Sequence, residues 1–140
     1  MPILNFKPQF VEPIRAGRKN HTIRADRKIP IKAGDLLYLY CGLRHKGAFR
    51  IISHPVLCTR VLNIRIEISI GDDLVFVGGE QLNRDEMERL AQADGFSSWD
   101  DMADFWKANH GVTRKCGPDG WITRCVDFSG QIIHWKGKTQ

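Results

Sequence analysis

The stretch AGRKNHTIRADRK, residues 16–28, contains the side chains of this chain that are best suited to chemistry. Thr22 and Arg24 are two positions apart in a β-branched segment, and alternate residues of a strand share one face. A hydroxyl and a guanidinium should therefore lie side by side, with Arg18 and Lys19 just before them. Such a group can hold a phosphate or a carboxamide through its cations, while Thr22 donates a hydrogen bond or attacks.

The same stretch has a simpler interpretation as a solvated basic turn, because charged side chains are mostly exposed. On a strand, His21 and Ile23 should face away from Thr22. The last part, Asp26 to Lys28, is typical of a solvated loop. The order of residues in 17–24 is thus more informative than the charge.

Charge is unevenly distributed along the chain. Residues 1–65 hold 13 Lys or Arg against 3 Asp or Glu, residues 66–104 hold 2 against 11, and residues 105–140 hold 6 against 2. The net charge is +5. This segregation predicts a face that attracts an anionic partner, unless the fold mixes the segments in space.

Established catalytic and metal-binding motifs are absent from the sequence. It has no P-loop, GxGxxG, GxSxG or HExxH motif, and no zinc-deaminase pattern. The four cysteines form no CxxC pair, so we expect free thiols rather than disulfides or a zinc site. We predict neither a metal nor another cofactor.

The elements around the site can be read from local patterns. We expect a strand at 3–6, a short helix at 8–17 that ends at Gly17, and a strand that begins near 20. A turn at 32–35 leads into a β-rich run at 36–40, and alternating segments within 48–70 are interrupted at 54–55. A further strand covers 73–79.

Two helices follow with clear start and stop signals. Asn83 and Glu86 form a capping-box pattern before a helix that ends at Gly95. Ser98 begins a second helix that ends at Gly111. Its apolar stripe consists of Trp99, Met102, Phe105 and Trp106, and helical spacing favours a core role over base stacking.

The tail predicts two strands around a hairpin turn at Ser129–Gly130. Strands outnumber helices, which favours a single α+β domain over residues 1–140, built on a small mixed barrel or sheet. No apolar run approaches the roughly 20 residues that span a bilayer, and the N-terminal residues lack signal-peptide order. We therefore expect a cytoplasmic protein without membrane contact.

Three ordered segments resemble the ASCH family, named for activating-signal-cointegrator homology. Residues 16–24, AGRKNHTIR, resemble its GxKxxTIR signature, and IKAGDLLYLYCGLR resembles its turn-plus-strand element. LAQADGFSSWDDMADFWKANHG resembles its helical segment, so that the likeness covers residues 3–112. The resemblance implies a PUA-like fold, a small β-barrel with flanking helices.

The resemblance also implies binding of RNA or a modified nucleoside. One branch of the family hydrolyses N4-acetylcytidine with the signature Lys and Thr and a Glu from the helical segment. Carried over, the first two are Lys19 and Thr22, and the Glu position falls on Asp94, which is one methylene shorter. In this interpretation Lys19 acts as the base for Thr22, and Asp94 orients Lys19 or activates water.

The resemblance further implies that the strand at 36–40 lines the cleft. Tyr40 and Arg44 would then contact a base and a phosphate, and Lys46, Arg18 and Arg24 would add positive charge. Three activities stay open at this level: an amidohydrolase, a ribonuclease that uses Lys19, Tyr40 and Arg44, and an RNA-binding module without turnover.

Overall fold

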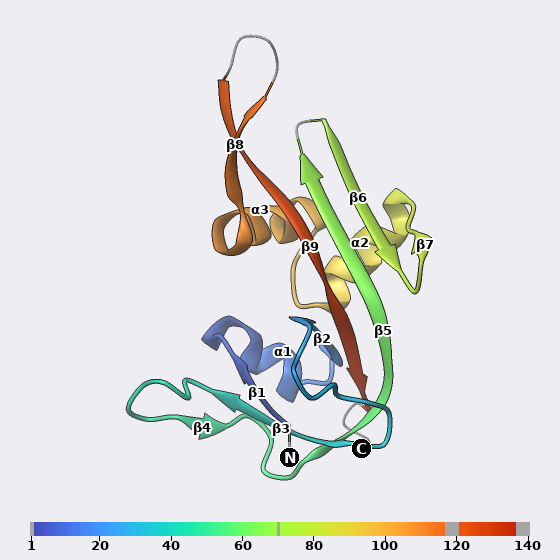
Figure 1. The fold of residues 1–140 in the computed structure, drawn as a ribbon. Coiled ribbons are helices and arrows are strands. Elements are labelled where there is room, and N and C mark those ends of the chain that lie inside the picture. Colours follow the sequence, from blue (N-terminus) through green and yellow to red (C-terminus); the bar gives the residue numbers. More distant parts are fainter. Residues whose placement is uncertain (1, 70, 117–120, 137–140) are drawn as a thin grey trace.

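The computed structural model describes residues 2–69, 71–116 and 121–136, including the side chains of all these except 114–123. It is a mixed α+β fold, in which the described strands join one curled sheet against which helices pack (Figure 1). The strands are β1 (Ile3–Phe6), β2 (His21–Ala25), β3 (Leu36–Cys41), β4 (Phe49–Arg50), β5 (Val56–Ser69), β6 (Asp72–Val77), β7 (Glu80–Gln81), β8 (Val112–Cys116) and β9 (Trp121–Trp135). The helices are η1 (Pro8–Phe10), α1 (Val11–Arg15), α2 (Arg84–Ala93) and α3 (Trp99–His110).

Two long antiparallel strands, β5 and β9, run through the molecule and connect its two ends (Figure 1). The outer edge of β5 pairs with β6 in one half and with β3 in the other, while β9 pairs with β2 and β8. Strand β1 lies parallel to β3. β2 pairs with the C-terminal half of β9, which places the site stretch beside one of the two long strands.

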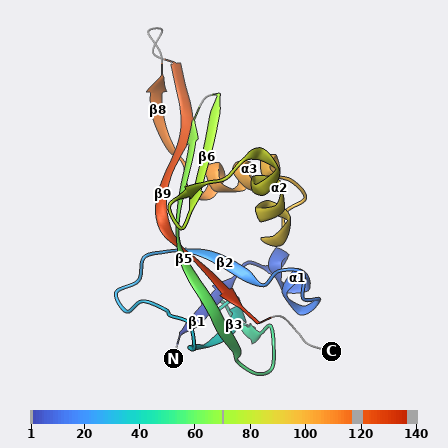
Figure 2. The ribbon, with the colours of Figure 1, turned by 90° about the vertical axis from the view of Figure 1, so that its right-hand side faces the viewer.

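The helices lie on one side of the sheet, as Figure 2 shows. Buried side chains form two core clusters, one beneath β1, β3 and α1 and the other between α2, α3 and the long strands. Phe96 and Phe105 pack against both clusters. The boundary between the clusters therefore lies where η1 meets α3 and the connection after α2, since Phe10 of η1 packs against both rings.

The residues predicted to begin and end the helices are confirmed. Asn83 and Glu86 form the reciprocal capping box of α2, and Gly95 follows its C-cap with a φ of 99°. The Ser98 side chain caps α3, which ends before Gly111. The short N-terminal helix is also present, split into a 3-10 turn and α1 before Gly17.

The predicted hairpin at Ser129–Gly130 is wrong, because β9 continues through both residues. Gly130 pairs with Ala25 on one side and with Ile64 on the other. A Cβ at Gly130 would lie 2.2 Å from the carbonyl oxygen of Arg24. Glycine is needed here for close approach between strands rather than for a turn.

The α+β class is confirmed. Cys41, Cys58 and Cys125 are free and buried, as expected for thiols that pack as small apolar groups, while the Cys116 side chain lies outside the described part. Within the described residues, no helix combines the length and hydropathy that a membrane crossing requires.

Candidate functional site

Four polar side chains are buried at the boundary between the two core clusters: Lys19, His21, Thr22 and Asp94. Lys19 is 2% exposed and Asp94 is 6% exposed. Buried charges are rare in proteins unless they are paired, because loss of hydration costs several kcal/mol, on the order of 5, for each ion. A cluster of this kind is therefore a candidate site.

Local structure on both sides brings Lys19 to Asp94. The chain turns after α1 at Gly17, whose φ is 80°, and the Lys19 amide then donates to the carbonyl of Pro13 at 3.0 Å. Asp94 is the C-cap of α2. A Cβ at Gly95 would lie 3.2 Å from the Phe10 ring and 3.6 Å from Cδ of Lys19, so Gly95 leaves room for both side chains.

The Lys19 ammonium is held by two acceptors of one residue. Its Nζ donates to Oδ1 of Asp94 at 2.5 Å and to the Asp94 backbone carbonyl at 2.8 Å. The same Nζ lies 4.7 Å from the centroid of the Phe10 ring, within cation–π range. These contacts fix both the position and the direction of the amine.

The buried environment shifts both pKa values. Burial lowers the pKa of Lys19 below its ordinary value, Asp94 opposes the shift, and Arg24 adds to it. Burial opposes ionisation of Asp94, but Lys19 and His21 together hold the pKa of this carboxyl below its ordinary value. Lys19 is thus easier to deprotonate to the neutral amine than a solvated lysine.

His21 is a member of the cluster that the sequence did not indicate. Its Nε2 lies 3.1 Å from Oδ1 of Asp94, a contact that strand alternation alone does not predict. The ring N–H lacks the alignment of a hydrogen bond, so this is a close polar contact. His21 also packs edge-on against His134, whose pKa is lowered to about 4 by burial and by the neighbouring His21 and Arg60.

Thr22 and Arg24 share a strand face, as predicted. Nε of Arg24 donates to Oγ1 of Thr22 at 3.2 Å, which leaves the hydroxyl proton of Thr22 free to be donated elsewhere. Nη2 of Arg24 donates to the carbonyl of Asn5 at 2.5 Å, and the guanidinium lies 4.8 Å from the Phe6 ring centroid. Burial and the nearby Arg27 lower the pKa of Arg24 to about 10, against the charge of Asp94, so it stays protonated at neutral pH.

Lys19, Thr22, Arg24 and Asp94 line one cavity of about 420 Å³. The rest of its described lining is largely aromatic, and it was not predicted from the sequence as part of a site. The aromatic rings are those of Phe6, Phe10, Phe105, Trp106, His110 and Phe128. They come from β1, η1, α3 and β9, so only tertiary structure assembles them.

The remaining predicted ligand-binding residues do not line this cavity. Arg18 is exposed and forms an ion pair with Glu12. Tyr40 lies on the face of β3 opposite the core, where its hydroxyl accepts a hydrogen bond from Nε of Arg50 at 3.0 Å. Arg44 and Lys46 are exposed in the loop after β3. The structure therefore places these residues outside the lining of the cavity that contains Lys19.

Among the described residues, no three His, Cys, Asp or Glu side chains gather closely enough to hold a metal ion. Comparisons of the chain with models of known families, with curated proteins and with solved structures find no match.

Proposed function

We propose that this protein is a PUA-like ASCH domain that hydrolyses the amide of a modified nucleoside such as N4-acetylcytidine. The observation that carries the proposal is the buried Lys19–Asp94 pair, which shares a cavity with Thr22. A buried, oriented lysine that lines the same cavity as a hydroxyl has the features of a general base. The order of Lys19, Thr22 and Arg24 in the chain matches the family signature.

The shape and lining of the cavity favour a nucleoside over a long polymer. A volume of about 420 Å³ lies within the usual range for small-molecule sites. Aromatic rings such as Phe105 and Phe128 offer faces and edges to a planar base. The half-buried guanidinium of Arg24 offers charge-assisted hydrogen bonds to a carbonyl oxygen.

The bonding around Lys19 suits proton transfer. A neutral amine has two N–H groups and one lone pair, and Asp94 accepts at two oxygens. When both N–H groups point to Asp94, the lone pair is free to accept the proton of Thr22. The hydrogen bond from Arg24 to Oγ1 then stabilises the developing alkoxide.

In the proposed reaction, Oγ1 of Thr22 forms a bond with the acyl carbon and its proton passes to Lys19. The C–N bond of the amide breaks, and Lys19 returns the proton to the leaving exocyclic amine. Water then hydrolyses the threonine ester, releasing acetate and the free hydroxyl. Asp94 acts through Lys19 as a positioning residue.

The shorter side chain of Asp94 is compatible with this role. Its carboxylate contacts Lys19 directly, and its backbone carbonyl binds the same amine. The C-cap position places backbone and side chain together at the end of α2. A ribonuclease that combines Lys19 with Tyr40 and Arg44 is less well supported, because neither of the latter lines the cavity.

A hydrolysis panel tests the proposal. The protein is incubated with N4-acetylcytidine, its 2′-deoxy form and other acylated nucleosides, and the products are separated by chromatography. We expect release of cytidine from N4-acetylcytidine, loss of release in Lys19→Ala, and full release in Lys28→Ala, which changes an exposed loop cation. Saturable binding without release would instead favour a binding module, and no turnover at high enzyme concentration rejects the amidohydrolase.

A further inference from the structure

His21 is a buried titratable side chain that the proposed hydrolysis does not use. It is 5% exposed, and its Nε2 lies 3.1 Å from Oδ1 of Asp94. The same oxygen accepts a hydrogen bond from Nζ of Lys19 at 2.5 Å. One carboxylate oxygen thus contacts two nitrogens, and each of them can bind a proton.

The capacity of His21 to bind a proton at Nε2 is unused in the structure. This atom is buried, yet it has no aligned hydrogen-bond partner among the described residues. Buried polar atoms without a partner are rare in folded proteins. Lys19, by contrast, directs its amine to the carboxylate and to the carbonyl of Asp94. The contact between His21 and Asp94 is therefore close enough to become a charge-assisted hydrogen bond once Nε2 is protonated.

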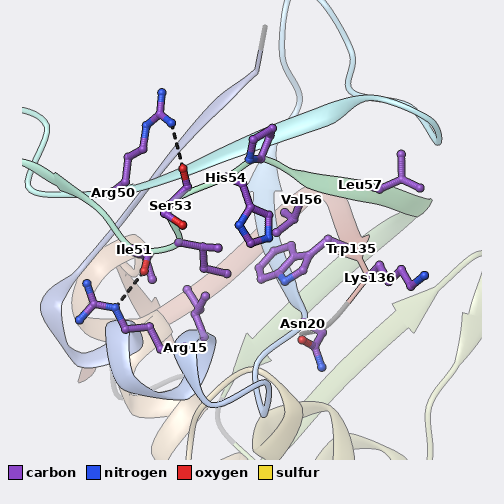
Figure 3. Close-up of a pocket in the computed structure, with 13 residues that line it drawn as sticks. Arg15, Asn20, Arg50, Ile51, Ser53, His54, Val56, Leu57, Trp135 and Lys136 are labelled. Atoms are coloured by element: carbon purple, nitrogen blue, oxygen red, sulfur yellow. Dashed lines mark hydrogen bonds between the residues drawn. The ribbon is translucent and has the colours of Figure 1, made fainter. Parts of the chain in front are cut away.

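The chain neighbours of His21 line two different cavities, but His21 belongs to the described lining of neither. Thr22 lines the cavity that contains Lys19. Asn20 lines a larger cavity of about 860 Å³ between α1, the segment that joins β4 to β5, and the end of β9 (Figure 3). Because the imidazole lies between these cavities and not in them, a charge on it acts on Asp94 with little screening by water.

The other charged and titratable groups around His21 leave this interaction with Asp94 undisturbed. His134 of β9 packs edge-on against the His21 ring, with 5.3 Å between the centroids. Burial, His21 and Arg60 lower the pKa of His134 to about 4, so this second ring is uncharged at neutral pH. Arg24, on the same strand as His21, adds a positive charge to these surroundings. Among the described residues, Asp94 is the one carboxylate within ion-pair distance of His21.

The role proposed for Lys19 creates a conflict that His21 can remove. A buried carboxylate needs a positive partner, and the ammonium of Lys19 is that partner for Asp94. As a general base, Lys19 must instead be neutral, which would leave the carboxylate uncompensated. An imidazolium at His21 would contact the same carboxylate oxygen and restore the balance of charge.

We propose that His21 is a positioning residue that takes up the proton of Lys19 and so prepares the neutral amine for hydrolysis. One proton leaves Nζ of Lys19, passes through Oδ1 of Asp94 and binds Nε2 of His21. Lys19 becomes neutral, His21 becomes an imidazolium, and the net charge of the three groups does not change. This inference rests on the proposed function, and it explains how the base can form near neutral pH.

The pH dependence of hydrolysis tests this role. In His21→Gln, Lys19 becomes neutral only by releasing its proton to solvent, which becomes about tenfold more favourable with each pH unit. We expect kcat at about pH 7 to fall about tenfold or more, while KM changes less than about twofold. The deficit should narrow as the pH rises to about 9, after subtraction of the uncatalysed rate.

The matched control is His54→Gln, which removes an exposed imidazole and should change neither kcat nor its pH dependence. Far-ultraviolet circular dichroism establishes that both variants are folded. An equal loss in His21→Gln at every pH would reveal a purely structural role and overturn the proposal, and so would an unchanged kcat.

Nuclear magnetic resonance of the histidine rings provides a readout that does not need turnover. In Lys19→Met, His21 is left as the cationic partner of Asp94, so both of its ring nitrogens should carry a proton at about pH 7. The ring nitrogen shifts should show more of this charged form than in the unaltered protein, with the exposed His54 as the unchanged reference.

This second measurement separates the inference from the function on which it rests. A His21 ring that stays neutral in Lys19→Met overturns the inference, even if the protein hydrolyses N4-acetylcytidine. A gain of charge on His21 without any hydrolysis supports the proton exchange and counts against the proposed function alone. If His21→Gln does not fold, the comparison of ring shifts decides.

Discussion

Lys19 places an ammonium group in the interior, and the carboxylate of Asp94 compensates the cost of burying this charge. The pair is buried on both sides, with two hydrogen bonds from one nitrogen to one residue. A hydrophobic pair of similar volume would often be as stable, so stability alone does not explain two buried charges. The role of general base that we propose for the amine accounts for them.

Breaking the pair should strongly destabilise the fold. We expect Asp94→Ala to lower the free energy of unfolding by about 3–5 kcal/mol, because Lys19 is left without its partner. Urea denaturation at neutral pH measures the change. The matched control is Asp104→Ala, which removes an exposed carboxylate and should cost less than about 1 kcal/mol.

The double variant Lys19→Met, Asp94→Ala should recover part of the loss, because it leaves no unpaired charge.

The contribution of Asp94 to stability also depends on pH. Its folded pKa lies below the ordinary value, so the stabilisation is complete above the unfolded pKa and is lost as the pH falls through the folded value. An Asp94→Ala protein as stable as Asp104→Ala would contradict this description of the pair.

At this scale, the sequence predicted part of the site. Gly17, Lys19, Thr22 and Arg24 are close in the chain, and strand alternation places the last two on one face. Asp94 was assigned only through the resemblance, and no role was predicted for His21. The aromatic wall was unpredictable because four separate elements contribute to it, and each ring fits equally well into a core pattern.

Among the elements, the helices were predicted well and β9 was not. Helix ends depend on local capping, and the capping patterns at Asn83 and Ser98 predict where α2 and α3 begin. A Ser–Gly step in a β-rich tail has two explanations, a turn or a close approach of strands. Only the partners of Gly130, which are distant in sequence, decide between them.

Gly130 allows β9 to approach β2, the strand that carries Thr22 and Arg24, at close range. We expect Gly130→Ala to lower the free energy of unfolding by about 2 kcal/mol or more, because the new methyl group meets the Arg24 carbonyl. The same shift should reduce hydrolysis by displacing Arg24. Thermal unfolding and the nucleoside assay measure the two effects.

The neighbouring exposed residue offers a control. Ser129→Ala removes one hydroxyl that accepts a hydrogen bond from Arg65, and it should change stability by less than about 1 kcal/mol. If Gly130→Ala were as stable and as active as Ser129→Ala, the close packing of β2 on β9 would not matter for the site.

The segregation of charge along the sequence is only partly retained in the arrangement of charges over the folded molecule. Many carboxylates of residues 66–104 pair with cations such as Arg84 or cap helices, and Asp94 turns inward. Arg15, Arg50 and Lys136, which have no carboxylate within ion-pair distance among the described residues, instead line a cavity of about 860 Å³. Composition predicted an anionic partner, but the place where charge concentrates depends on strand pairing.

The α+β class followed from the count and order of local elements. The sheet itself, with β5 and β9 joining its two ends, could not be predicted, because register depends on contacts between distant segments. Figure 1 shows the consequence, since the site stretch lies where these long strands meet the helical side. The cavity that contains Lys19 accordingly draws its lining from β1, β2, α3 and β9.

The most direct test of the central claim is release of cytidine from N4-acetylcytidine by three forms of the protein: unaltered, Thr22→Ser and Thr22→Val. Serine keeps the hydroxyl, and valine keeps the shape of threonine without it. We predict release by the first two and a loss of at least about a hundredfold in Thr22→Val. Equal release by Thr22→Val, in a protein that remains folded, would contradict the assignment of Thr22 as the nucleophile.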